Sequence, residues 1–222
     1  MGVGHAAVAL GAAGAVPRLN VGWLIFAALL ADLLLGIFAF LGLEHASVPP
    51  DFPSRHYLTF TFPYSHGLLP LLLWSTIAGF LVSLFHRSNR KRIFIVIGAL
   101  VLSHFVLDAL VHVAGLPLAG ENSPKIGLEL WNHMGPELVL ETLMAVGGVV
   151  MYLKVAAARS PAVSRWGISI FIALLTALTW TQLFSTKPPQ PAQLIPGWIV
   201  APLVLSALAY VLDRKRVALV AS

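Results

Sequence analysis

Six stretches of this sequence are apolar for long enough to cross a lipid bilayer as helices. A helix needs about 20 residues to span the ~30 Å hydrocarbon core of a bilayer. Only 10% of the 222 residues are charged, whereas soluble domains carry roughly 25% charged residues. The sequence therefore predicts an all-α fold, a polytopic membrane helix bundle with about six transmembrane helices. These lie near residues 21–43, 65–86, 93–116, 136–153, 166–184 and 195–212.

A further apolar segment, residues 2–16, is shorter and rich in Ala and Gly. No basic residue precedes it, as one would in a signal peptide. We therefore expect a retained half-helix that turns back at Pro17 to Asn20.

The basic residues fall mostly on one side of the predicted helices. Of the fourteen Lys and Arg residues, eleven lie on that side. They are Arg18, Arg87, Arg90, Lys91, Arg92, Lys154, Arg159, Arg165, Arg214, Lys215 and Arg216. By the positive-inside rule this side, with both termini, faces the cytoplasm. The net charge of +5 thus reflects membrane topology rather than nucleic-acid binding. The chain has no cysteine, which excludes thiolate metal sites and a cysteine nucleophile.

Three ionisable residues interrupt one predicted span at intervals of four. His104, Asp108 and His112 therefore share one stripe of a helix. Because a charge at the bilayer centre costs at least ~2.5 kcal/mol, such residues usually face the protein interior and pair with one another. Imidazole and carboxylate are also the ligands expected for zinc and related divalent ions. The alternatives are a buried hydrogen-bond network or a pH-sensitive helix contact.

Other ionisable residues are predicted at a similar depth. Counted at ~1.5 Å per residue from the nearest basic residues, Asp32 and His66 lie within roughly two helical turns of that stripe, in the outer half of the membrane. His5 joins them if the half-helix turns back. We therefore predict that these six residues bind one or two divalent metal ions, and their ligand types favour zinc. Asp108 would bridge to a second ion that also uses His5 or His112.

The chain shows no internal repeat, and we expect a single membrane domain over residues 1–222. Residues 1–153 would form its metal-site part. Residues 154–222 would add two further transmembrane helices.

Three more residues are candidates for chemistry. Glu141 lies inside a predicted span and is our candidate catalytic residue, a ligand or a general base, the alternative being a structural carboxylate. Arg55 and Lys125 lie in predicted outer loops, where they would bind a phosphate or carboxylate headgroup of a substrate. The alternative for both is ordinary solvated charge.

The sequence resembles the bacterial inner-membrane proteins known as metal-dependent hydrolases. The resemblance covers about two thirds of the chain, from residue 4 to about 153. The matching pieces are "GHAAVALG", "LLADLLLG", "YSHGLLPLLLW", "SHFVLDALVH", "KIGLELWN" and "LETLMAVGGVVMYL".

The family pattern has a histidine near the N-terminus, a Pro-Asp pair, a Ser-His or Thr-His step and a His-x-x-x-Asp. The resemblance implies that the corresponding residues here are metal ligands: His5, Asp32, His66, His104 and Asp108. Ala31 stands where the family has a proline, so we expect a straighter helix at that point. The order of these ligands is also similar to that of zinc-dependent phospholipase C, which suggests a phosphoesterase.

The sequence thus predicts a membrane-embedded, divalent-metal-dependent hydrolase that acts on an amphiphilic or phosphoester-type substrate from the outer side. A transporter for a divalent metal or protons, using the same intramembrane residues, is the alternative. A scaffold with a structural metal is the third interpretation.

Overall fold

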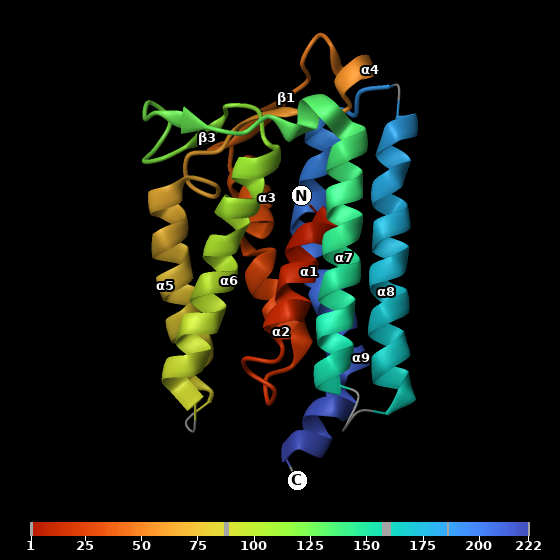
Figure 1. Ribbon diagram of the computed structural model, residues 1–222. Coiled ribbons are helices and arrows are strands. Elements are labelled where there is room, and N and C mark those ends of the chain that lie inside the picture. The colour runs from red at the N-terminus through yellow and green to blue at the C-terminus, as the bar shows by residue number, and fades with distance from the viewer. Residues whose placement is uncertain (1, 87–88, 157–160, 186, 222) are drawn as a thin grey trace.

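The computed structural model describes residues 2–86, 89–156, 161–185 and 187–221, which form a bundle of helices with short paired strands at one end (Figure 1). The all-α prediction is confirmed. Arg87 and Arg159, counted above among the basic residues, lie outside the described residues. The longer helices are α1 (Gly2–Ala12), α2 (Val21–Ala28), α3 (Leu30–Phe40), α5 (Leu68–Leu84), α6 (Arg90–Val111), α7 (Met134–Ala156), α8 (Ala162–Trp180) and α9 (Pro191–Ala221).

The loops at the upper end of Figure 1 contain the remaining elements. Strand β1 (His45–Ser47) pairs antiparallel with β2 (Thr59–Thr61), and β3 (Leu116–Pro117) pairs antiparallel with β4 (Lys125–Ile126). The short helical turns are α4 (Phe52–Arg55), η2 (Leu130–His133) and η3 (Thr181–Phe184).

Fewer helices than expected are long enough to cross a membrane. In the described chain, four qualify by length and composition, or up to five if the bent pair α2 and α3 counts as one span. The predicted span near residues 65–86 is the one that does not qualify. Its helix, α5, has only 17 residues, a length of about 26 Å at ~1.5 Å per residue. The four are Arg90–Val111, Leu130–Ala156, Ala162–Phe184 and Pro191–Val217.

Helices α2 and α3 meet at a bend of 51°. The break falls at Leu29, which has φ −102° and ψ 8°. The expectation that Ala31 would straighten this helix was therefore wrong, since the chain bends without a proline. At this break the Ala28 carbonyl oxygen accepts a hydrogen bond from a side chain of α6, as described below.

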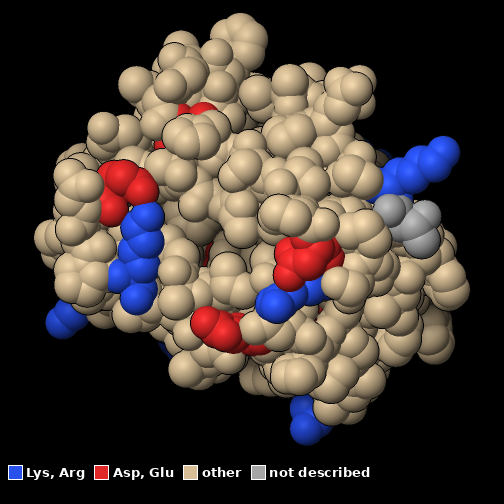
Figure 2. All heavy atoms as spheres, turned by 90° about the horizontal axis from the view of Figure 1, so that it is seen from above, with Lys and Arg blue, Asp and Glu red and all other residues tan. Residues whose placement is uncertain are grey.

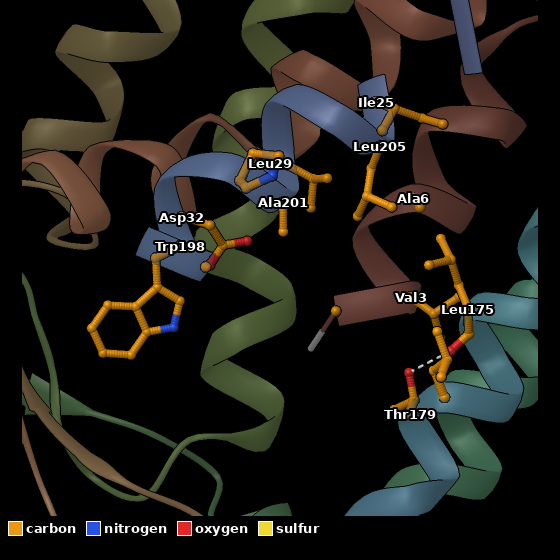
Figure 3. Close-up of a pocket in the computed structure, with 14 residues that line it drawn as sticks. Val3, Ala6, Ile25, Leu29, Asp32, Leu175, Thr179, Trp198, Ala201 and Leu205 are labelled. Atoms are coloured by element: carbon orange, nitrogen blue, oxygen red, sulfur yellow. Dashed lines mark hydrogen bonds between the residues drawn. The ribbon is translucent and has the colours of Figure 1, made fainter. Parts of the chain in front are cut away.

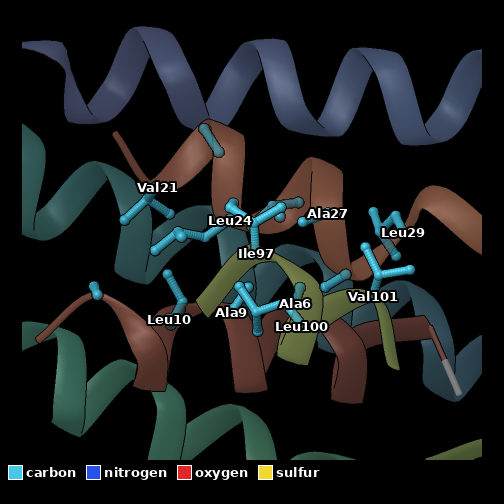
Figure 4. Close-up of a cluster of buried hydrophobic side chains, with 14 of the residues drawn as sticks. Ala6, Ala9, Leu10, Val21, Leu24, Ala27, Leu29, Ile97, Leu100 and Val101 are labelled. Carbon is cyan, nitrogen blue, oxygen red and sulfur yellow. The ribbon is translucent and has the colours of Figure 1, made fainter. Parts of the chain in front are cut away.

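Helix α1 lies inside the bundle, as expected for the half-helix, where it packs against α7, α2, α6 and α8. Its small residues allow this close packing. Figure 4 shows Ala6, Ala9 and Leu10 of α1 gathered with Leu24 of α2 and Ile97 of α6 in the buried apolar cluster. A helix that is too short to span is thus stabilised by burial on nearly every side.

The contact between α1 and α7 depends on one glycine. A Cβ atom on Gly148 would come within 2.5 Å of the Ala7 carbonyl oxygen. The neighbouring Gly147 has nothing within 4 Å of the corresponding position. The backbones of the two helices therefore approach more closely at Gly148 than any side chain there would permit.

A buried ion pair fastens the turn after α1 to helix α9. Arg216 is 1% exposed and donates to both carboxylate oxygens of Asp213, at 2.7 Å each. The same guanidinium donates to the carbonyl oxygens of Pro17 and Leu19, and Asp213 accepts from the Val21 backbone N–H. Arg216, counted above among the basic residues of the predicted cytoplasmic side, is therefore a buried structural residue.

We predict that Gly148→Val destabilises the protein, because the added side chain must push α1 away from α7. Overpacking of this kind costs about 1–3 kcal/mol. The midpoint of thermal unfolding in detergent should fall. The matched control, Gly147→Val, has open space around it and should unfold within error of the wild-type protein. Equal midpoints for the two variants would show that α1 does not pack against α7 in this way.

Candidate metal centre

The six predicted ligands come together from four parts of the chain. Helix α1 contributes His5, α3 contributes Asp32, and the turn before α5 contributes His66. His104 and Asp108 lie on α6 and His112 follows its last residue. All are buried by relative accessibility except Asp32, whose side chain is 33% exposed.

The hydrogen bonds of His104 fix which ring nitrogen can bind a cation. Its Nδ1 lies 2.8 Å from the Ala28 carbonyl oxygen. A carbonyl oxygen only accepts hydrogen bonds, so Nδ1 must be protonated, and in the neutral ring Nε2 then has a free lone pair. The bend between α2 and α3 supplies this carbonyl, and it thereby orients the ring.

His66 is fixed in the same tautomer by a two-step relay. The Ser65 hydroxyl donates to Oε2 of Glu44 at 2.6 Å, so its oxygen is left to accept from Nδ1 of His66 at 2.7 Å. The Glu44 carboxylate also accepts from the backbone N–H groups of Tyr64 and Ser65. Burial raises the pKa of the Glu44 carboxyl, while these hydrogen bonds act in the opposite direction.

The two free nitrogen atoms face each other. Nε2 of His66 and Nε2 of His104 are 3.2 Å apart. Two lone pairs at this distance repel unless a proton or a cation lies between them. Neighbouring ligand atoms of a tetrahedral zinc ion, bound at ~2.0–2.1 Å, are about 3.3 to 3.4 Å apart. The spacing therefore suits a zinc ion bound by both histidines.

Carboxylate oxygens complete this group. Oδ2 of Asp108 lies 3.3 Å from Nε2 of His104 and 3.6 Å from Nε2 of His66. Oδ1 of Asp32 lies 3.8 Å and 3.9 Å from the same two nitrogen atoms. Both carboxylates thus lie within 4 Å of these two nitrogen atoms, with Asp32 slightly further out than Asp108.

His5 and His112 both contact Asp108. Nε2 of His5 is 3.2 Å from Oδ1 of Asp108, and its ring stacks on His104 with centroids 3.7 Å apart. Nε2 of His112 is 3.5 Å from Oδ2 of Asp108. Among the described residues, the buried Nδ1 of His5 has no hydrogen-bond partner. The half-helix therefore does deliver a histidine to the cluster, as its sequence predicted.

The described residues contain two groups that could hold a metal ion, and both include His104. One is His5, His104 and Asp108, and the other is Asp32, His66 and His104. His104 has only one nitrogen available, since the other is bonded to Ala28. The arrangement therefore favours one ion over two.

Glu141 lies beside the cluster, at the first turn of α1. Its Oε2 accepts a hydrogen bond from the backbone N–H of Val3, at 3.1 Å. Backbone N–H groups at the start of a helix have no partner within the helix, and a carboxylate there is favoured by the helix dipole. Glu141 thus holds the end of α1 that carries His5.

The two predicted headgroup ligands are paired with acids of their own loops. Arg55 forms an ion pair with Asp51 and donates a hydrogen bond to the side-chain oxygen of Asn132. Nζ of Lys125 lies 2.5 Å from Oε1 of Glu121. Figure 2, seen from the loop end, shows basic side chains next to acidic ones on this face. Their loop positions agree with prediction, but both charges are already balanced locally.

Aromatic rings separate the cluster from these loops. The ring of His112 packs against Trp131 with centroids 4.0 Å apart, and against Phe62 at 5.5 Å and Phe60 at 5.9 Å. Trp131 in turn stacks on Tyr57, next to Arg55. The loop side of His112 is therefore covered by aromatic side chains.

Sequence reasoning missed Glu44 and Ser65. Glu44 was not among the predicted site residues, yet it is only 1% exposed. The signal that could have found Ser65 is the "SH" dipeptide at 65–66, because a metal-binding histidine usually donates its other ring N–H to a nearby oxygen atom, and a serine hydroxyl can accept it. Glu44 is distant in sequence and carried no such signal.

Comparison of the chain with protein-family models, with curated proteins and with solved structures gives no match. The geometry of this cluster is therefore the basis for inferring a function. Its chemistry defines a buried site of imidazole and carboxylate groups that could hold a metal ion.

We predict that Ser65→Ala weakens zinc binding, because His66 loses the acceptor that fixes its tautomer and ring orientation. Loss of such an orienting partner typically lowers metal affinity about 10–100-fold. Competition with a chromophoric zinc chelator measures this change in purified protein. Ser47→Ala is the matched control, since that exposed serine bonds to Thr59 in the same loop region. Unchanged zinc affinity in Ser65→Ala would show that the hydrogen bonds from His66 through Ser65 to Glu44 do not contribute to metal binding.

Proposed function

We propose that this protein is a membrane-embedded hydrolase that uses one divalent metal ion, most suitably zinc. The observation that carries the proposal is the pair of Nε2 atoms of His66 and His104, 3.2 Å apart with both Nδ1 atoms engaged elsewhere. Asp108 and Asp32 supply the negative charge that a divalent cation requires in an apolar bundle.

The unequal exposure of the ligands supports catalysis over a purely structural ion. The side chains of His66, His104 and Asp108 are at most 3% exposed, whereas that of Asp32 is 33% exposed. Structural zinc sites are closed by four protein ligands, whereas catalytic sites keep one position for water or substrate. Asp32, being also the most distant ligand, marks the side from which a substrate would approach.

When bound, a divalent ion supplies Lewis acidity and lowers the pKa of water bound to it. In the hydrolysis we propose, the water oxygen forms a bond to phosphorus and the ester P–O bond breaks. A carboxylate of this chain takes the proton from water, and the departing alkoxide takes up a proton. Glu141 is the candidate acceptor, because its hydrogen bond to Val3 holds the carboxylate beside the turn that carries His5.

The resemblance to bacterial metal-dependent hydrolases agrees with this proposal and extends it to the inner membrane. There the site would lie in the periplasmic half and the C-terminus would face the cytoplasm, whereas the expectation that both termini face the cytoplasm does not fit α1, whose first turn lies inside the bundle beside the site (Figure 1). Helix α5, although short, would serve as a sixth span in a locally thinned or tilted arrangement. The similarity in ligand order to zinc-dependent phospholipase C favours a phosphoester as the substrate class.

Transport of a metal ion or of protons is less well supported. A transit pathway needs further polar groups between the cluster and the opposite end of the bundle. The buried charges described there, Asp213 and Arg216, bond to each other and to backbone groups. Their hydrogen bonds therefore have a structural role and do not supply binding groups for a transported ion.

We predict that protein purified without added metal or chelator contains about one equivalent of divalent metal. His104→Ala should lose this metal, because it removes a nitrogen common to both candidate groups. Elemental analysis by mass spectrometry measures the content. The control is His45→Ala, an exposed histidine on β1. Equal, near-zero metal in the wild-type protein and both variants would refute the proposed site.

The proposed reaction is tested with 4-nitrophenyl phosphate, a small phosphoester whose product is coloured. The wild-type protein should hydrolyse it, and His104→Ala should reduce the rate to background while His45→Ala does not. Glu141→Gln should lower the rate but keep the metal, since Gln retains an acceptor for the Val3 N–H. A metal-loaded wild-type protein with no hydrolysis of phosphoesters, carboxylic esters or amides would leave the site without the proposed role.

Orientation is tested with single cysteines introduced into this cysteine-free chain. Asn89 and Asn122 are exposed and lie at opposite ends of the bundle. In intact spheroplasts an impermeant thiol reagent should label Asn122→Cys and spare Asn89→Cys, because the basic residues favour the cytoplasm for position 89. The reverse labelling would place the site in the cytoplasmic half.

A further inference from the structure

One cavity of the bundle reaches the candidate metal centre from the side. It has a volume of about 380 Å³ and lies between α1, the bend of α2 and α3, and helices α8 and α9. In Figure 3 the Asp32 carboxylate points into this space, with Trp198 and Ala201 of α9 on one side and Leu175 and Thr179 of α8 on the other.

The walls of the cavity are apolar, and its inner end is acidic. Asp32 is the single ionisable side chain among the described lining residues. The Thr179 hydroxyl donates to the Leu175 carbonyl oxygen at 3.0 Å, so it is satisfied within its own helix. Ile25, Leu29 and the other lining residues offer mainly hydrocarbon surface.

The mouth of the cavity opens between the outer faces of α8 and α9. Leu178, which lines it, is 64% exposed. In a membrane this face contacts the lipid chains, whereas the loop end of the cluster is covered by Trp131 and Phe62. An amphiphile would thus reach Asp32 from within the bilayer.

A second apolar cavity provides a comparison within the same molecule. It has a volume of about 330 Å³ and lies between α2, α3 and α5, where Trp23, Trp74 and Phe85 line it. None of the six clustered histidine and aspartate residues is among the described residues of its walls. Of these two cavities, the one between α8 and α9 alone combines hydrocarbon walls with a residue of the candidate centre.

We propose that this cavity binds the single hydrocarbon chain of an amphiphile whose phosphate-type head reaches the metal centre. The inference rests on the proposed function, because the head must be drawn to a bound cation beside Asp32. Small-ligand pockets hold about 300–1,000 Å³, so a volume of 380 Å³ suits one chain better than the two chains of a phospholipid. The substrate class is therefore a single-chain alkyl or prenyl phosphoester.

The chain offers a variant that fills the cavity without disturbing its walls. Gly197 lines the cavity, and a Cβ atom there would meet nothing within 4 Å. Gly197→Leu should therefore fold and occupy part of the space. Gly147→Leu is the matched control, because Gly147 has equal freedom on α7 and is not a lining residue of the cavity.

The probe is dodecyl phosphate carrying a terminal diazirine, photolysed with the protein in phosphatidylcholine nanodiscs. Mass spectrometry of the labelled peptides should locate the adduct at Leu175 to Thr179 or at Trp198 to Leu205. Excess dodecyl phosphate should compete with it. Gly197→Leu should lose this labelling and Gly147→Leu should keep it. Equal labelling of the two variants, or adducts spread over exposed apolar residues of other helices such as Phe80 and Leu143, would overturn the inference.

Metal content and hydrolysis of 4-nitrophenyl phosphate by the wild-type protein separate the two proposals. This ester has no hydrocarbon chain, so neither measurement depends on chain binding in the cavity. If hydrolysis persists and the specific labelling is absent, the cavity proposal fails alone. If labelling is as expected and no metal or hydrolysis is found, the proposed function fails, and with it the reason for the head to reach Asp32.

Discussion

The structure depends on the cost of placing ionisable groups inside an apolar bundle. Each such group must be neutralised or hydrogen-bonded, because water is not present to solvate it. The protein meets this requirement in two separate places. At one end Arg216 neutralises Asp213 and bonds to backbone carbonyl groups. Near the other end, four histidines surround Asp108, and two of their nitrogen atoms face each other. In the first network the charged groups are neutralised by protein partners. In the second, the two facing nitrogen lone pairs repel each other unless a proton or a cation lies between them.

The backbone irregularities of the bundle are explained by the same cluster. The bend at Leu29 places the Ala28 carbonyl where His104 donates to it. The turn at residues 63–67 before α5 allows His66 to approach His104, and the helix after it has 17 residues. Helix α1 begins inside the protein, where Glu141 accepts a hydrogen bond from its first turn and His5 contacts Asp108. Departures from regular spanning helices thus coincide with the positions of the ligands.

The arrangement also explains how a buried centre could meet a substrate. Aromatic rings cover it toward the loops, while Asp32 is open to a lateral cavity between α8 and α9. These two helices contribute none of the clustered residues, yet they form the outer wall of that cavity. Helices α8 and α9, the last two predicted spans, therefore form the walls of the cavity that leads to Asp32.

The sequence by itself determined the helical class, the half-helix and the residues of the cluster. Apolar length predicts helices, and ionisable residues in apolar segments must converge because isolated charges are unstable there. The i, i+4 spacing of His104, Asp108 and His112 also fixed their common face. Only the tertiary structure decided the rest. The roles of Glu44 and Arg216 depend on contacts with residues distant in sequence, which no local pattern encodes. The tautomers of the histidines, the shortening of α5 and the cavity beside Asp32 likewise result from how the helices pack, because hydrogen-bond partners and empty space exist only between elements.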